Sequence, residues 1–220
     1  MLRIEGLRKA FSGPAGPVPV VDIAAFALGA GEQRALRGRS GSGKTTFLNL
    51  IAGIQRADAG RILFDDVEVS ALGEPERDRL RAQKLGYIFQ SFNLLQGFTV
   101  LENVMLGMAF GGGRVDRNRA RHLLARVGLG ERADYWPRQL STGQQQRAAV
   151  ARALANAPRL VLADEPTGNL DAVHRDETLQ LIRDVCREQQ AALLLVSHDD
   201  AVLGRFEGVT DFAALNRPSV

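Results

Sequence analysis

Three short, uninterrupted runs of apolar residues indicate strands that are buried on both faces. Leu85 to Phe89, Leu160 to Ala163 and Leu193 to Val196 lack the alternation that marks a half-exposed strand. Such runs are typical of parallel strands covered by helices. Gln33 to Leu36 reads as a further short strand, and Val18 to Phe26 has strand-like character.

Helices are predicted between these strands. Thr45 to Ala52 reads as a helix because Gly53 follows it, and glycine commonly ends helices. Arg117 to Val127 and Gln144 to Leu154 also read as helices, and a helical spacing relates Leu179, Ile182, Val185 and Cys186. The alternation of strands and helices predicts an α/β fold with an open, mostly parallel sheet, whose ligands bind at the carboxyl ends of the strands.

Length and composition predict a soluble protein of one domain, or of one domain with a subdomain. The 220 residues are 45% apolar, enough to bury a full core. The net charge of +3 is small and both signs are interspersed, so the basic isoelectric point reflects arginine usage and predicts no nucleic-acid partner. No apolar run approaches the roughly 18 residues of a membrane span. The N-terminus has no apolar signal region, and Cys186 is the only cysteine, which suits the reducing cytoplasm.

A phosphate-binding loop follows the strand at 33–36. The pattern G-x-x-x-x-G-K-[ST] lies between a predicted strand and a predicted helix, as the motif requires. Glycines let the backbone aim N–H groups at phosphates, Lys44 supplies a positive charge, and the Thr45 hydroxyl ligates magnesium. We expect nucleotide to bind at Gly38, Arg39, Ser40, Gly41, Ser42, Gly43, Lys44, Thr45 and the following Thr46.

Two acidic residues follow the apolar run at 160–163. Asp164 is expected to hold Mg²⁺, and Glu165 to polarise an attacking water as general base. Alone, such a pair indicates only the solvated end of a strand. With Lys44 and Thr45 already placed, the ATP and magnesium interpretation is favoured.

These motifs, together with "LSTGQ" at 140–144, "NLD" at 169–171 and "VSH" at 196–198, resemble the ATP-binding cassette (ABC) ATPases over nearly the whole chain. The resemblance implies a single ABC ATPase domain over residues 1–220. Its P-loop NTPase (RecA-like) core would take about 1–90 and 159–220, with a small N-terminal antiparallel β region. The remaining segment, about 91–158, would be an inserted helical subdomain.

The resemblance explains "LSTGQ", the signature segment (Leu140–Gln144), as a second anion site. In this family two cassettes meet head to tail, and the signature of one covers ATP bound to the other. It implies that Ser141, Thr142, Gly143 and Gln144 act in trans on a second ATPase subunit. An identical copy is favoured because one chain holds every half-site motif. Thr142 replaces a glycine of the family pattern, and we expect the site to work nonetheless.

Four further roles come from the resemblance alone. Gln90 matches the Q-loop glutamine that senses magnesium and the membrane partner. We therefore expect it to take part in catalysis and to bind the metal. Asp171 matches the D-loop aspartate that links the two sites. His198 matches the switch histidine, which holds the γ-phosphate and the attacking water. Phe11 stands where an aromatic ring stacks on adenine, although a lone phenylalanine also suits the core.

Five other residues have weaker interpretations. Arg37 and Arg39 replace apolar or small residues of the family, and either add charge near the nucleotide or are merely solvated. His122 and His174 have no motif around them, so we expect surface positions. Trp136 is expected to pack the loop that precedes the signature.

Segments at 89–95, 99–104 and 163–171 resemble one branch of the family, which contains lipoprotein-releasing, macrolide-exporting and cell-division ATPases. Such proteins generally work with a separate membrane subunit. The resemblance therefore implies an integral-membrane permease partner and a peripheral position on the inner face of the cell membrane. Phe92, Leu94 and Leu95 suit either a docking cleft for that subunit or the core of the helical insertion.

The favoured function is the ATPase subunit of an exporter or extractor, closed by ATP and reopened by hydrolysis. Amino-acid importers share a similar segment at 92–104, so an importer subunit is the alternative. A soluble ATP-driven clamp fits less well because the sequence has neither a long coiled coil nor a second cassette. A non-enzymatic nucleotide-binding module is weaker still because Glu165 and His198 are both present.

Overall fold

The parallel sheet predicted from the apolar runs forms the centre of the molecule. The computed structural model describes residues 1–14 and 16–218. Every neighbouring pair in this five-stranded sheet is parallel, which confirms the predicted α/β class. Its order is β6 (Leu85–Ile88), β7 (Leu160–Asp164), β8 (Ala192–Ser197), β3 (Gln33–Arg37) and β9 (Gly208–Asp211).

A second, antiparallel sheet is built from the N-terminal segment, as expected. The order of its strands is β2 (Gly16–Leu28), β1 (Leu2–Gly13), β4 (Ala59–Phe64) and β5 (Val67–Glu68). β1 and β2 form an antiparallel hairpin. Leu2 pairs with Leu28 at its open end, and Gly13 pairs with Gly16 at the turn. The strand predicted at 18–26 is therefore longer at both ends, because its hairpin partner continues the ladder of hydrogen bonds.

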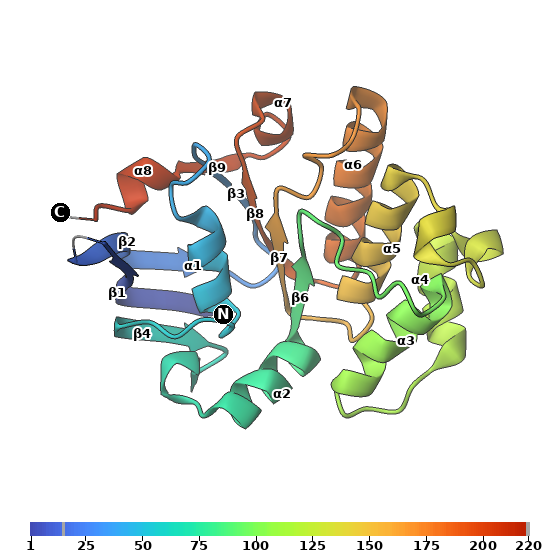
Figure 1. The fold of residues 1–220 in the computed structure, drawn as a ribbon, viewed down its shortest axis with the longest axis horizontal. Coiled ribbons are helices and arrows are strands. Elements are labelled where there is room, and N and C mark those ends of the chain that lie inside the picture. Colours follow the sequence, from blue (N-terminus) through green and yellow to red (C-terminus); the bar gives the residue numbers. More distant parts are fainter. Residues whose placement is uncertain (15, 219–220) are drawn as a thin grey trace.

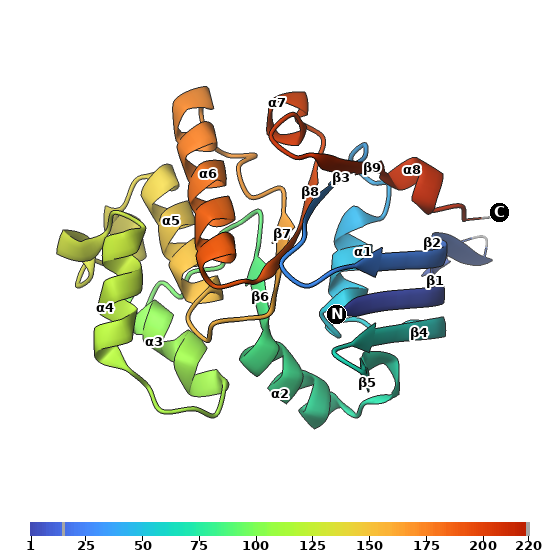
Figure 2. The same ribbon diagram turned by 180° about the vertical axis from the view of Figure 1, so that it is seen from behind.

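Helices cover the parallel sheet on both sides. Figures 1 and 2 show α3, α4 and α5 gathered on one side of the molecule, and α1 beside the antiparallel sheet on the other. Among the described residues, no helix combines the length and the apolar character that crossing a membrane requires. The α-helices are α1 (Lys44–Ile51), α2 (Glu74–Lys84), α3 (Val100–Phe110), α4 (Arg117–Arg126), α5 (Thr142–Ala153), α6 (Ala172–Glu188), α7 (Asp200–Leu203) and α8 (Phe212–Leu215), and the 3₁₀ turns are η1 (Val69–Ala71), η2 (Gly130–Arg132) and η3 (Pro137–Gln139).

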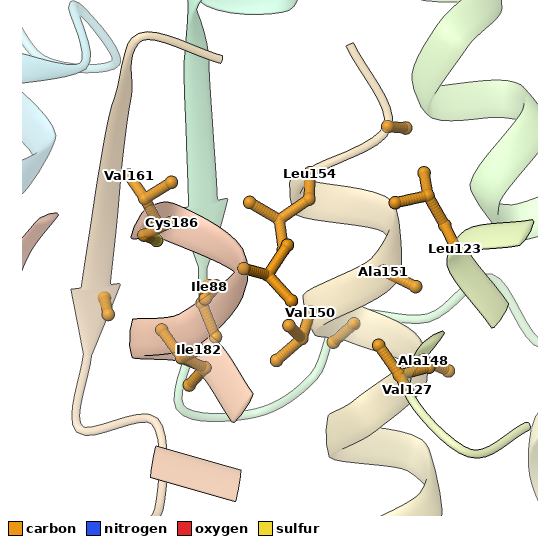
Figure 3. Packing of buried hydrophobic residues seen from close by; sticks show 14 of the residues in the cluster. Ile88, Leu123, Val127, Ala148, Val150, Ala151, Leu154, Val161, Ile182 and Cys186 are labelled. Atoms are coloured by element: carbon orange, nitrogen blue, oxygen red, sulfur yellow. The ribbon is translucent and has the colours of Figure 1, made fainter. Parts of the chain in front are cut away.

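The parallel sheet separates two apolar cores. Alternate residues of β7 point to opposite sides, so Val161 belongs to one core and Leu162 to the other. The first core joins the sheet to α3, α4, α5 and α6; Figure 3 shows Leu123 of α4 and Ile182 of α6 on opposite sides of α5. The second joins the sheet to α1 and the antiparallel strands, where the Phe47 ring centroid lies 5.5 Å from that of Phe26. Both cores fix the ends of the central strands.

The start of α5 was predicted wrongly, and β9 was not predicted. α5 begins at Thr142 rather than Gln144, because Ser141 caps it: the Ser141 Oγ accepts from the Gln144 N–H at 3.3 Å and the Gln144 Oε1 accepts from the Ser141 N–H at 3.1 Å. Thr142 and Gly143 therefore lie in the first turn of the helix. β9 is an additional strand at the edge of the parallel sheet, and it follows the last predicted one.

Candidate nucleotide-binding site

The loop from Gly38 to Gly43 joins the end of β3 to the start of α1. Gly41 and Gly43 have φ angles of 78° and 97°, a left-handed conformation that side chains disfavour. A Cβ on Gly43 would also lie 2.8 Å from the Val20 carbonyl oxygen. The loop therefore needs glycine at Gly43 for two independent reasons, conformation and space.

Lys44 is buried beneath this loop and its ammonium faces the loop backbone. Its Nζ donates to the carbonyl oxygens of Gly38 at 2.7 Å and Arg39 at 2.8 Å. Burial lowers the pKa of Lys44, against the opposing effect of the charges on Glu165 and Asp164. An ammonium has three donors, so a bound anion would gain a charge-assisted hydrogen bond here.

Asp164 ends β7 at the same edge of the sheet and is only 7% exposed. Its pKa is raised chiefly because burial disfavours the charged carboxylate, and the charge of Glu165 adds to this effect. A hydrogen bond from the Thr45 side chain and the charge of Lys44 act in the opposite direction. A buried carboxylate beside a hydroxyl offers two oxygen ligands to a hard cation such as Mg²⁺.

Glu165 is held by residues at the end of β8. Its Oε1 lies 2.8 Å from the His198 Nδ1, and its Oε2 accepts from the Ser197 Oγ at 3.1 Å. The Glu165 backbone has a φ of 44°, and its N–H donates to the Val196 carbonyl. Sequence reasoning missed Ser197, although its position directly before His198 at the carboxyl end of a strand was a usable signal.

These residues meet at one cavity of about 250 Å³. Ser42 Oγ is buried without a hydrogen-bond partner among the described residues, and Ser42 does not line the cavity. Gly38 and Arg39 are not among the lining residues in the described structure, but Lys44 donates to the carbonyl oxygens of both. The cavity is lined by Val20, Ser40, Gly41, Gly43, Lys44, Thr45, Thr46, Gln90, Asp164, Glu165 and His198.

Gln90 follows β6 and is tied to a loop distant in sequence. The Asn169 Nδ2 donates to the Gln90 carbonyl oxygen at 2.9 Å. A Cβ on Gly168 would lie 3.7 Å from the Gln90 Nε2, so the two loops are in contact. Asn169 was part of a predicted motif, but its bond to Gln90 was not foreseen because the two residues lie 79 positions apart.

The signature segment lies outside this cavity: in the described part of the chain, Ser141, Thr142, Gly143 and Gln144 are not among its lining residues. Ser141 and Thr142 are exposed at the start of α5, whereas Gly143 is buried. Free N–H groups at a helix start favour anions, so the segment stays a predicted second anion-binding feature.

Asp171 caps α6, and its side chain accepts from the backbone N–H groups of Val173 and His174. The His174 Nδ1 also lies 2.7 Å from the Asp171 Oδ2. His174 is exposed, which confirms its predicted surface position, and so is His122. On its other side the His174 ring faces the signature turn, because a Cβ built on Gly143 would lie 3.5 Å from the His174 Cδ2.

Four other residues singled out in the sequence lie at exposed or partly exposed positions. Phe11 is 40% exposed on the hairpin of β1 and β2, so the core interpretation is wrong, while adenine stacking stays a prediction. Arg37 is exposed and pairs with Asp200 at 2.9 Å, and Arg39 is exposed as well. Trp136 is partly exposed at the start of a 3₁₀ turn before the signature.

A larger cleft of about 660 Å³ lies beside α2 and α3. Its apolar lining includes Phe89 and the 74%-exposed Phe110. Of the residues predicted either to form a docking cleft or to enter the core, Leu94 is buried in the core, and Phe92 packs against it. Leu95 is 46% exposed. The core interpretation is therefore correct for two of these three residues.

Comparison with known proteins agrees with this geometry. The family model described as "ABC transporter" matches residues 21–168. The lipoprotein-releasing system ATP-binding protein LolD 1 of Caulobacter vibrioides is 45% identical over 93% of this chain and 89% of its own length. LolD of Anaeromyxobacter dehalogenans is 44% identical over 96% of this chain and 89% of its own length.

A third relative and a solved structure extend the comparison. The macrolide export ATP-binding/permease protein MacB of Syntrophobacter fumaroxidans is 42% identical over 92% of this chain, which spans 29% of that protein. A dimeric structure of the cassette MJ0796 in a post-hydrolysis state with ADP and phosphate superposes with a TM-score of 0.88. It is 33% identical and covers 95% of this chain and 93% of its own. This chain therefore belongs to the ABC transporter family, as an ATPase cassette closely related to those of LolD and MacB.

Proposed function

We propose that this chain is the ATP-hydrolysing subunit of a bacterial export or lipoprotein-release complex, which dimerises on ATP and drives a separate membrane subunit. The observation that carries the proposal is the cavity where the phosphate loop meets Asp164, Glu165 and His198. The names of the LolD and MacB relatives support the export or release assignment.

Nucleotide would bind along the loop from Gly38 to Thr46. The loop N–H groups and the Lys44 ammonium would hold the phosphates. Phe11 would stack on the adenine ring from the neighbouring hairpin. The small volume of the cavity suits the phosphate end of ATP rather than the whole nucleotide.

The residues present fit a magnesium ion. Thr45, Asp164 and Gln90 line the same cavity and offer hydroxyl, carboxylate and amide oxygens. When bound, Mg²⁺ would neutralise charge on the phosphates. The raised pKa of Asp164 supports this assignment, because a buried carboxylate of this kind is stabilised by a cation.

Glu165 would accept a proton from the attacking water, and His198 would orient the water and the γ-phosphate. The hydrogen bonds from Ser197 and His198 hold the two carboxylate oxygens of Glu165 in a fixed orientation. Such fixing matters because hydrolysis of ATP depends mainly on positioning and electrostatics.

The second anion-binding feature would complete the active site of another copy. Ser141, Thr142, Gly143 and Gln144 are not among the lining residues of the chain's own phosphate cavity in the described structure, so we assign them to a nucleotide held by a partner. Asp171 would lie between the two sites. The dimeric structures of the MJ0796 cassette, one with ADP and phosphate, support this arrangement.

The cleft beside α2 and α3 would receive a cytoplasmic helix of the membrane subunit. Its lining joins the exposed Phe110 and the half-buried Phe89 with Arg79 and Arg152, which suits an amphipathic helix with acidic residues. The name of the MacB relative pairs an ATP-binding part with a permease. Docking there would place this chain at the inner face of the cell membrane.

Affinity capture from the native membranes in mild detergent tests this function. We expect a membrane subunit with few spans and a large outer domain to co-purify with the native chain. Phe110→Asp should abolish the capture, whereas Val209→Asp, at an exposed position on β9, should retain it. Capture of a many-spanning permease with a solute-binding protein would indicate an importer. Absence of any membrane protein would contradict the coupling proposal.

A further inference from the structure

His174 joins two segments that the proposed function assigns to the interface between copies. It lies in the first turn of α6, directly after the loop that carries Asn169 and Asp171. The His174 Nδ1 is 2.7 Å from the Asp171 Oδ2, while the other oxygen of the same carboxylate accepts from the His174 backbone N–H at 3.0 Å. Both oxygens of Asp171 are therefore engaged by one residue.

The chemistry of this pair fixes the tautomer of the ring. A carboxylate can only accept hydrogen bonds, so a neutral His174 must carry its proton on Nδ1. The pKa of Asp171 is lowered because the His174 backbone N–H and the His174 ring both donate to it. The carboxylate is thus held ionised, in one orientation, at the end of the loop.

The opposite side of the ring lies against the signature turn. A Cβ built on Gly143 would lie 3.5 Å from the His174 Cδ2 and 3.7 Å from its Cγ, which is van der Waals distance. Gly143 is buried although Ser141 and Thr142 beside it are exposed. One turn further along, Arg147 of α5 and Glu177 of α6 form an ion pair at 2.5 Å, so the two helices are fastened next to the histidine contact.

We propose that His174 is a positioning residue that holds Asp171 and the signature turn in one fixed relation, so that both meet the ATP of a partner copy together. The inference rests on the proposed function, in which these segments act in trans. It concerns closure of the dimer and leaves the binding of nucleotide to a single chain untouched, because His174 does not line the phosphate cavity in the described structure.

The test uses Glu165→Gln as the parent, in which ATP is bound but not hydrolysed. Adding His174→Ala should raise the ATP concentration for half-maximal dimer formation about fivefold or more, the effect of one lost hydrogen bond plus a lost contact. Affinity of the monomer for Mg-ADP should stay unchanged, which shows that the fold is intact. His122→Ala, at an exposed histidine on α4, is the matched control.

A second variant distinguishes the hydrogen bond of His174 from its packing. His174→Asn places an amide N–H close to the position of Nδ1, so it should restore most of the dimerisation lost in His174→Ala. A ¹⁵N histidine spectrum should show the proton of His174 on Nδ1. Equal dimerisation of parent and His174→Ala, or a proton on Nε2, would overturn the inference alone. A parent that stays monomeric would overturn the proposed function as well.

Discussion

The His198 Nδ1 lies 2.8 Å from the Glu165 Oε1, so a hydrogen bond joins the two side chains to which we assign hydrolysis. They come from the carboxyl ends of neighbouring parallel strands, β7 and β8, whose register pairs Asp164 with Val196. Because the carboxylate only accepts, the imidazole must donate from Nδ1, whichever its charge. The pairing of strands thus determines the chemistry at this edge.

Ser197 should contribute to the rate through Glu165. Ser197→Ala removes the donor at 3.1 Å from the Glu165 Oε2, and also an acceptor for the Asp199 N–H. We expect kcat to fall about fivefold, the worth of one hydrogen bond, with KM for ATP changed less than twofold. Steady-state ATPase assays check this, with Ser12→Ala as an exposed control. An unchanged kcat would show that Ser197 does not position Glu165.

Lys44→Ala should remove most of the affinity for nucleotide. The ammonium lies under the phosphate loop with one donor left for an anion, and a charge-assisted hydrogen bond of this kind is worth about 100-fold in affinity. Titration calorimetry with Mg-ATP measures the loss. Lys84→Ala, at the far end of α2, should bind as the native chain does. Unchanged binding by Lys44→Ala would refute the phosphate-loop assignment.

In the absence of ligand, the ionised Asp164 carboxylate should lower the free energy of unfolding. Its folded-state pKa is raised by burial, so protonation favours the folded state: the resulting stability is complete below its ordinary value of 3.8 and is lost as the pH rises through the folded value. Asp164→Asn should therefore raise the melting temperature at pH 8 by a few degrees, about 2–4 °C per kcal/mol, and change little near pH 3.

With added Mg-ATP, the native protein should melt at a higher temperature than Asp164→Asn. The asparagine variant loses an anionic ligand for magnesium. Native protein should gain more from Mg-ATP than Asp164→Asn does, as thermal unfolding with and without ligand will show. Asp66→Asn serves as the control because that carboxylate is exposed. Equal stabilisation of both proteins by Mg-ATP would contradict the assignment of Asp164 to the metal.

Thr142 is expected to be compatible with activity. It occupies the first position of α5, exposed and clear of the cap formed by Ser141 and Gln144. Thr142→Gly should change the ATPase rate by less than tenfold, because the cap and Gly143 are unaltered. A rate at least tenfold higher than native would show instead that the β-branched side chain keeps the closed dimer apart.

The central strands and the phosphate loop were predictable because their signals are local. β7 and β8 are buried throughout, and they read as unbroken apolar runs. β9 escaped notice because Gly208 and Thr210 interrupt its apolar character. α2 was not predicted either, because only Arg77 and Leu80 of its eleven residues are buried and its sequence shows no apolar face.

Contacts between distant segments were not predictable. Asn169 reaches Gln90 across 79 positions, and Ser197 reaches Glu165 across 32. The link from His174 to Gly143 depends on the packing of α6 on α5, which neither helical pattern encodes alone. Motifs therefore predicted which residues carry the chemistry, while the fold was needed to show which residues hold them.

The most direct test of the account is the mass of Glu165→Gln in solution, by size-exclusion chromatography with light scattering. With saturating Mg-ATP we expect a dimer of twice the 23.9 kDa chain mass, and with Mg-ADP a monomer. The dimer is expected because ATP would be held between the phosphate loop of one copy and the signature of the other. A variant that binds Mg-ATP and still elutes as a monomer would contradict the proposal that two copies close around ATP.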